Sequence, residues 1–137
     1  MINDTNDDQG VFSKFATPEG YSLDYYASGS VFKWTVGTGG VARQVASTIP
    51  IRSGVWYYVA VSYNDTTKVI AISVNGHTDS ITGTGALNIP DSVPFVLGFS
   101  QNTTYYRGAV GRLACFNRIP SNDGELNDIY REIPTWG

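Results

Sequence analysis

The chain has 137 residues, of which nine are basic and twelve acidic, giving a formal net charge of −3. Its length fits one domain with a two-layer core, and its basic residues are too scattered to follow a phosphate backbone or an anionic membrane surface. Charged residues make up only 15% of the chain, while aromatic residues reach 13% and glycine numbers 15, which favours an all-β fold.

Residues 1–10 (MINDTNDDQG) are polar and acidic, and we expect them to form a lead ahead of a single domain over residues 11–137. This opening is unlike a signal peptide, and no apolar run approaches the roughly 20 residues of a membrane span. We therefore expect that an extracellular or virion-surface location would be reached through a parent protein or by another export route.

Short strands are predicted from residue 11 onward. VFSKFA (11–16) is followed by YSLDYY (21–26) and VFKWTV (31–36), whose side chains alternate between two faces with a period of two. Turn residues flank the third of these segments, and VARQVA (41–46) is predicted as a fourth strand. The residues that share one face are Tyr21, Leu23 and Tyr25 in one strand, and Phe32, Trp34 and Val36 in the next.

The stretch GVWYYVAVSYNDTTKVIAISVNG (54–76) is predicted to form a β-hairpin with its turn at NDTT. Asn75-Gly76 predicts a second tight turn because both residues tolerate positive φ, and a further strand should begin near His77. One face of the hairpin carries Val55, Tyr57, Val59, Val61 and Tyr63, and the other carries Trp56, Tyr58, Ala60 and Ser62.

Two more strands and one helix are predicted after the hairpin. The strands are PFVLGF (94–99) and YYRGAVGRLACF (105–116), and Cys115 should lie in the core as part of the second. The helix should be capped by Asn122 and end at Pro134. The total of about nine strands predicts an antiparallel β-sandwich with one short C-terminal helix.

Several of these segments, in the same order, resemble the laminin G-like jelly rolls of the concanavalin A-like lectin and glucanase superfamily. The similar stretches are VFSKF, WYYVAVSYN followed by ISVNG, FVLGFS, and YRGAVGRLACFNRIPSNDGELNDIY. The resemblance implies a jelly-roll sandwich in which Trp56 packs inside. Many members carry an acidic pair after the glycine of the closing strand, whereas this chain has Gly111-Arg112. Calcium is therefore only weakly implied, and we expect no cofactor.

Members of this family commonly have additional strands before the segment that matches VFSK. Only ten polar residues precede it here. Because a missing outer strand leaves backbone groups unpaired, we expect the chain to form a homo-oligomer or to be part of a larger chain.

The sequence does not predict an enzyme. Glycoside hydrolysis needs two carboxylates set across the bond, and the only glutamates are Glu19 in a turn and Glu125 and Glu132 on the predicted helix. Asp24 is a lone strand carboxylate, and the one histidine, His77, follows a turn where a surface position is expected.

Recognition of a carbohydrate is the leading hypothesis. Sugar binding needs an aromatic face together with rigid polar groups for the hydroxyls. We expect the binding residues in two loops at one end of the sandwich, namely Asn102, Tyr105, Tyr106 and Arg107 in the first and Asn64 and Asp65 in the second.

The alternative hypothesis is a structural, adhesion or assembly domain of a viral or cell-surface protein that binds no sugar. In that case the sandwich would contact a partner protein. A degenerate glucanase is a third and more distant interpretation. Fold alone does not choose among these classes.

Overall fold

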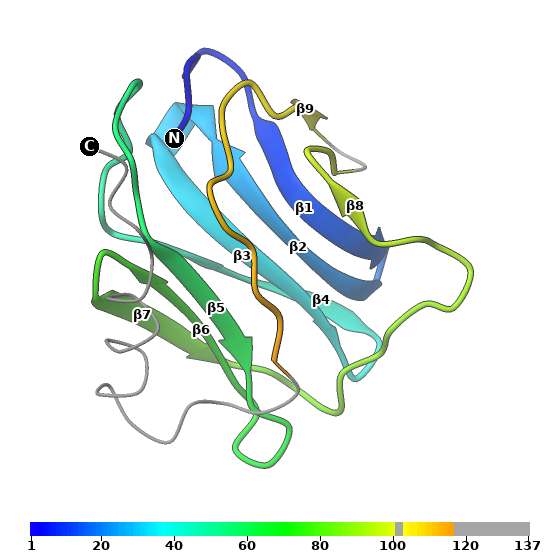
Figure 1. Cartoon of the computed structure of the whole chain (residues 1–137). Helices are drawn as coiled ribbons and strands as arrows, with labels where there is room; N and C mark the ends of the chain where they lie inside the picture. The colour runs from blue at the N-terminus through cyan, green and yellow to red at the C-terminus, as the bar shows by residue number, and fades with distance from the viewer. Residues whose placement is uncertain (101–102, 117–137) are drawn as a thin grey trace.

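The computed structural model describes residues 1–100 and 103–116, and these form two packed β-sheets (Figure 1). The predicted all-β, antiparallel sandwich is confirmed. Asn102 and the predicted helix at 122–134 lie outside the described residues. No helix in the described part of the chain is long and apolar enough to cross a membrane.

The larger sheet has six strands, ordered β4-β3-β2-β1-β8, with β9 also pairing with β1. Neighbouring strands are antiparallel, except that β9 runs parallel to β1. The bounds are β1 Gln9–Ala16, β2 Glu19–Tyr26, β3 Val31–Thr38, β4 Val41–Ala46, β8 Val96–Leu97 and β9 Thr104–Tyr105. A short 3₁₀ turn, Ala27–Gly29, joins β2 to β3.

The smaller sheet is the antiparallel meander predicted for the hairpin and the strand after it. It has the order β5-β6-β7, with β5 Val59–Tyr63, β6 Val69–Val74 and β7 His77–Thr82. Asn75 and Gly76 both have positive φ in the turn between β6 and β7, as predicted.

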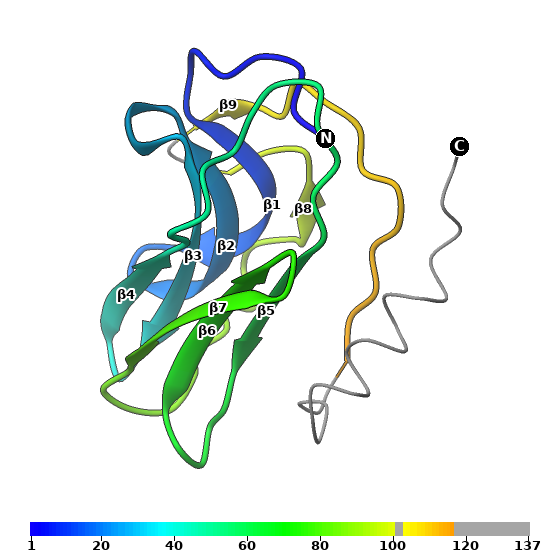
Figure 2. The ribbon, with the colours of Figure 1, turned by 90° about the vertical axis from the view of Figure 1, so that its left-hand side faces the viewer.

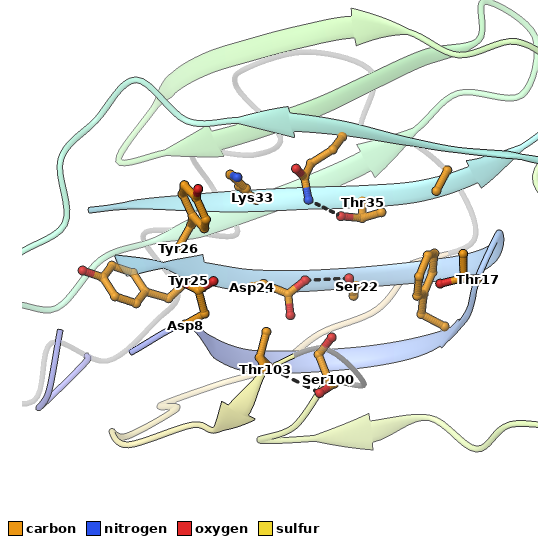
Figure 3. Close-up of a pocket in the computed structure, with 13 residues that line it drawn as sticks. Asp8, Thr17, Ser22, Asp24, Tyr25, Tyr26, Lys33, Thr35, Ser100 and Thr103 are labelled. Atoms are coloured by element: carbon orange, nitrogen blue, oxygen red, sulfur yellow. Dashed lines mark hydrogen bonds between the residues drawn. The ribbon is translucent and has the colours of Figure 1, made fainter. Parts of the chain in front are cut away.

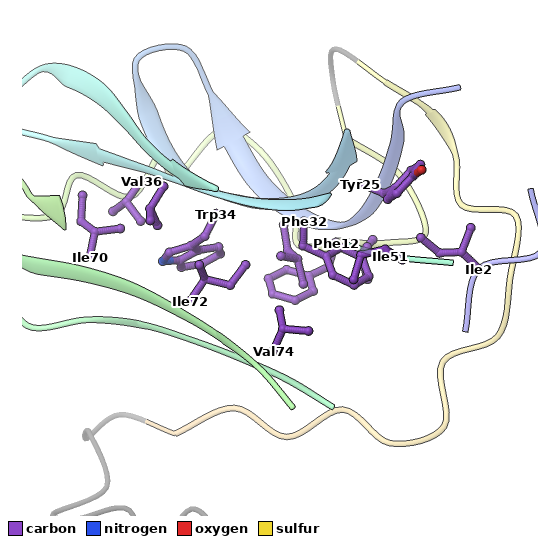
Figure 4. Packing of buried hydrophobic residues seen from close by; sticks show 13 residues of the cluster. Ile2, Phe12, Tyr25, Phe32, Trp34, Val36, Ile51, Ile70, Ile72 and Val74 are labelled. Carbon is purple, nitrogen blue, oxygen red and sulfur yellow. The ribbon is translucent and has the colours of Figure 1, made fainter. Parts of the chain in front are cut away.

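The core lies between the two sheets, as Figure 4 shows. The period-two alternation of β2 and β3 places Leu23 and Tyr25 inward, together with Phe32, Trp34 and Val36. The small sheet contributes Ile70, Ile72 and Val74, none of which has exposed surface. Burying these apolar side chains is the main stabilisation of the fold, at roughly 1.5–3 kcal/mol for each large one.

The prediction that Trp56 lies in the core is wrong, because its side chain is 56% exposed. Tyr57 packs against the core, so its neighbour on the extended chain points to the opposite side. The alternation of side chains along the strand placed Trp56 on the face opposite Tyr57, which is correct. The position implied for Trp56 by the resemblance to the family, inside the sandwich, is not. Trp34 is the tryptophan inside the sandwich, and its indole N–H donates to the Ser62 carbonyl at 3.2 Å.

The predicted strand over residues 105–116 is also wrong, apart from its first residue. β9 ends at Tyr105, and residues 106–116 form no strand, although Gly108 makes an isolated bridge to Ile2. Cys115 is exposed rather than buried, since the segment that carries it does not join either sheet.

The N-terminal segment packs onto the chain that follows β9. Ile2 is fully buried, and the Met1 carbonyl accepts hydrogen bonds from the Tyr106 hydroxyl at 2.8 Å and the Ala109 N–H at 3.0 Å. Gln9 and Gly10, from the expected polar lead, belong to β1. The acidic start of the chain is thus built into the domain.

Candidate functional site

The loop residues predicted to bind a ligand have mainly internal contacts. Tyr106 is half-buried, and burial raises its pKa to about 12. The Arg107 guanidinium contacts Asp4 at 2.6 Å and Asp7 at 3.3 Å. Tyr105 is 74% exposed and stacks at a tilt on Phe99 with 5.2 Å between ring centroids. Of these three side chains, Tyr105 is the one that presents most of its surface.

Asn64 and Asp65 shape their own turn. The Asn64 side chain accepts hydrogen bonds from the N–H groups of Thr66 and Thr67 at 2.9 and 3.0 Å. Asp65 forms an ion pair with Lys68 at 3.0 Å. Figures 1 and 2 show the β5–β6 turn and β9 at opposite ends of the molecule, so the structure does not bring the two predicted loops together.

A groove of about 310 Å³ instead crosses the outer face of the large sheet, on the side away from the core (Figure 3). Its floor comes from the residues of β2 and β3 that alternate with the core residues. These floor residues are Ser22, Asp24 and Tyr26 from β2 and Lys33 and Thr35 from β3.

The strand register arranges polar side chains of the outer face in a row, of which Ser22, Thr35 and Gln44 line the groove. Ser13 on β1 lies opposite Ser22 on β2, Ser22 opposite Thr35 on β3, and Thr35 opposite Gln44 on β4. The Gln44 amide donates to the Thr35 hydroxyl at 3.0 Å. Opposed side chains in a sheet lie about 5 Å apart, so the groups of this row have closely spaced, fixed positions. Ser13, Ser22 and Thr35 are buried, and the Gln44 side chain is the exposed member of the row.

Asp24 is the most perturbed group in the groove. Its Oδ2 accepts a hydrogen bond from the Ser22 hydroxyl at 2.7 Å, whereas its buried Oδ1 has no partner among the described residues. Burial raises the pKa of the Asp24 carboxyl, and the charge of Asp8 adds to that change. The hydroxyl of Ser22 opposes it, as does the nearby hydroxyl of Ser100, which does not reach hydrogen-bond geometry with Oδ1. A carboxyl group with a perturbed pKa and an unpaired oxygen in a groove is a candidate binding group.

One wall of the groove depends on a glycine. A Cβ at Gly10 would lie 2.1 Å from the Ser100 backbone nitrogen, so only glycine lets the chain after β8 cross this closely over β1. That crossing brings Ser100 and Thr103 to the groove beside Asp24 (Figure 3).

A cation and an aromatic ring stand together at the Tyr26 end of the groove. The Lys33 ammonium lies 3.1 Å from the centroid of the Tyr26 ring, and Lys33 is also opposite Asp24 in the strand register. This contact occupies one face of the ring. Among the described residues, no three His, Cys, Asp or Glu side chains are arranged to hold a metal ion.

Sequence reasoning identified every floor residue as lying on the opposite face from Leu23 and Trp34 but did not assign these residues to a site. The available signal was the run of serine, aspartate, lysine and threonine on that face of YSLDYY and VFKWTV. The sequence could not show that Ser100 would close over Asp24, because 76 residues separate the two positions.

Comparison with models of protein families identifies a family for this chain. The Laminin_G_3 model, described as the concanavalin A-like lectin/glucanases superfamily, matches residues 1–123. The chain therefore belongs to this family, as its resemblance implied. Comparisons with curated proteins and with solved structures found no match.

Proposed function

We propose that this protein is a non-catalytic carbohydrate-recognition module whose ligand binds in the groove on the outer face of the large sheet. The observation that carries the proposal is the set of hydroxyl, amide and carboxyl groups that three neighbouring strands hold along the groove, namely those of Ser22, Asp24, Thr35 and Gln44. A saccharide presents hydroxyl groups at fixed spacings, and side chains on a rigid sheet bind them with little loss of conformational entropy.

Asp24 is expected to make the strongest contact with the sugar. A carboxylate accepts hydrogen bonds from hydroxyl groups, and bonds to a charged acceptor contribute about 1.5–3 kcal/mol. Gln44 and Thr35 offer both donors and acceptors beside it. Phe15 lines the end of the groove far from Tyr26 but is buried, so the C–H face of a sugar ring would contact mainly the half-buried ring of Tyr26.

The size of the groove indicates weak binding by a single copy. Its volume of about 310 Å³ is at the lower end for small-molecule sites. We therefore expect low affinity for a short saccharide and a gain in avidity when several copies are linked.

We place the site at the groove rather than at the predicted loops because of what their side chains already contact. Tyr106 and Arg107 hold the N-terminal segment, and Asn64 and Asp65 hold their turn. Moving these groups to bind a ligand would leave their present partners unsatisfied, which costs free energy.

A glycan array followed by titration calorimetry tests the proposal. Asp24→Asn and Gln44→Ala should each weaken saccharide binding by about tenfold, the loss expected for one good hydrogen bond. Asp65→Asn is the matched control, since it removes a carboxylate from an exposed turn. Binding that survives both groove variants, or no binding to any glycan by folded protein, would contradict the proposal. Release of reducing sugar from a polysaccharide would instead show that the module is catalytic.

Assembly without a sugar ligand is the second candidate function, and a different observation favours it. Within residues 1–100 and 103–116, no strand pairs with β5 on its side away from β6, and an edge strand of this kind is suited to contact with a further strand.

A further inference from the structure

Tyr105 presents an open aromatic ring near the groove. Its side chain is 74% exposed, the highest value for a large apolar or aromatic side chain among residues 1–100 and 103–116. Phe99 packs on one side of the ring with 5.2 Å between the centroids, so the other face of the ring is the one that meets solvent. An exposed ring that is supported by a second ring offers a flat apolar surface for stacking.

The strand register places Tyr105 on the same side of the large sheet as the groove floor. Tyr105 on β9 pairs with Gly10 on β1 (Figure 1), and Gly10 pairs with Asp24 on β2. Paired residues of neighbouring strands project from the same face of a sheet, and Asp24 lines the groove on the outer face. Neighbouring strands lie about 4.8 Å apart, so the backbone at Tyr105 is about 10 Å from the backbone at Asp24.

The backbone on both sides of Tyr105 is held in place. The Thr104 N–H donates to the Asp8 carbonyl at 3.0 Å, and the Tyr106 N–H donates to the Gly98 carbonyl at 2.8 Å. These two hydrogen bonds fix the short strand β9 at the edge of the sheet. A ring on a fixed backbone loses little conformational entropy when it binds a partner.

Ser100 connects the groove with the exposed ring. Its backbone crosses closely over Gly10, the residue that separates Tyr105 from Asp24 in the register. Ser100 lines the groove, and its neighbour in the chain, Phe99, supports the Tyr105 ring. The groove and the ring are therefore adjoining parts of one surface.

The groove itself has little open aromatic surface. Phe15 is buried, and the Lys33 ammonium lies 3.1 Å from the centroid of the half-buried Tyr26 ring, where it covers one face. The polar groups of the groove suit the hydroxyl groups of a sugar, but the apolar side of a sugar ring needs an aromatic face. Tyr105 has such a face.

We infer that Tyr105 is a second contact for a saccharide chain, which stacks one sugar unit on this ring while another unit binds at Asp24. This inference rests on the proposed function. A single sugar ring is too small to contact both residues across about 10 Å. The partner is therefore an oligosaccharide of several units that lies across the strands, and a shorter saccharide occupies the groove alone.

Titration calorimetry with cello-, xylo-, manno- and chito-oligosaccharides of two to six units tests this arrangement. In a series that binds, the affinity should rise by about tenfold from the disaccharide to the hexasaccharide, since only the longer chain reaches Tyr105. Tyr105→Ala should remove this gain, so that the hexasaccharide binds no more tightly than the disaccharide. Tyr105→Phe keeps the aromatic ring and should retain the gain. The matched control is Trp56→Ala, which removes an exposed ring just before β5 and should leave the gain intact.

Asp24→Asn separates this inference from the proposed function. It should weaken the binding of the disaccharide and of the hexasaccharide by similar factors. An affinity that is independent of chain length, or a gain that persists in Tyr105→Ala, would overturn the second contact while the groove site stands. Hexasaccharide binding that Asp24→Asn leaves unchanged would contradict the proposed function and this inference with it. Failure of the folded protein to bind any of the four series would overturn the inference as well.

Discussion

Replacing Asp24 with asparagine should make the protein more stable at neutral pH while it weakens ligand binding. In the native protein the ionised carboxylate has a hydrogen bond to Ser22 on one oxygen and no partner among the described residues on the other, which is buried. Asparagine has nearly the same shape and keeps an acceptor for the Ser22 hydroxyl, but it carries no charge. The variant therefore removes the cost of burying a charge and keeps most of the local packing.

The expected gain follows from the cost of the unpaired oxygen. A buried acceptor without a partner costs about 1–3 kcal/mol, and more when it is charged. Because the asparagine still leaves one neutral group poorly satisfied, we expect a gain of about 1 kcal/mol in the free energy of unfolding at pH 7. For a domain of this size, that corresponds to a rise of about 4 °C in Tm.

The pH dependence of this gain has a definite sign. Burial raises the pKa of Asp24 in the folded protein above the ordinary value of 3.8. The folded state therefore binds this proton more tightly than the unfolded state does. The stability that the protonated Asp24 carboxyl contributes is fully present below pH 3.8 and is lost as the pH rises through the raised pKa. Wild type and variant should have similar stabilities in acid, and the variant should become the more stable of the two as the pH increases.

Urea denaturation of both proteins between pH 3 and pH 8 measures this difference. Asp65→Asn serves as the control with the opposite sign, because the hydrogen bond from Lys68 lowers the pKa of that exposed carboxyl. Folding favours the ionised form of Asp65. The Asp65→Asn variant should therefore have a lower free energy of unfolding than the wild type at neutral pH and a similar one in acid. An Asp24→Asn variant that is less stable than the wild type at pH 7 would refute the reasoning, since it would mean that the carboxylate is satisfied.

Three further predictions concern residues outside the groove floor. Tyr106→Phe should lower the free energy of unfolding by about 1 kcal/mol through the lost hydrogen bond to the N-terminal segment, as measured by urea denaturation. The Tyr106 phenol should stay protonated up to a pH of about 12 in a spectrophotometric titration, so its contribution persists above pH 10 and is lost near 12. Trp34→Ala should cost about 3–5 kcal/mol and Trp56→Ala less than about 1 kcal/mol, because the first side chain is buried and the second is exposed. Gly10→Ala should cost about 3 kcal/mol and weaken saccharide binding, because its methyl group would displace Ser100 from the groove wall.

Each of these predictions has an internal comparison. For Gly10→Ala the control is Gly29→Ala, whose methyl group would meet only side-chain atoms, the nearest at 3.3 Å. Equal losses of stability in the two glycine variants would contradict the crossing over β1. Similar losses in the two tryptophan variants would show that Trp56 is buried after all. A Tyr106 phenol that ionises near pH 10 would contradict its burial.

The sequence alone determined the fold class and the faces of most strands. In YSLDYY and VFKWTV, side chains on neighbouring residues of an extended backbone must point to opposite sides, so the pattern of Leu23 and Trp34 against Asp24 and Lys33 is a local property. The turn at Asn75-Gly76 was predictable for the same reason, because it depends on the φ preference of two adjacent residues.

Only the tertiary structure decided where the candidate site lies. Asp24 is half-buried in a groove that Ser100 also lines, and Ser100 reaches it by crossing closely over Gly10, a contact between residues that are distant in the sequence. In the loops that the sequence analysis predicted to bind a ligand, most of the polar side chains contact other residues of the chain, as Arg107 contacts Asp4. Periodicity shows which side of a strand a residue faces, but what covers that side depends on long-range packing, which local pattern does not encode.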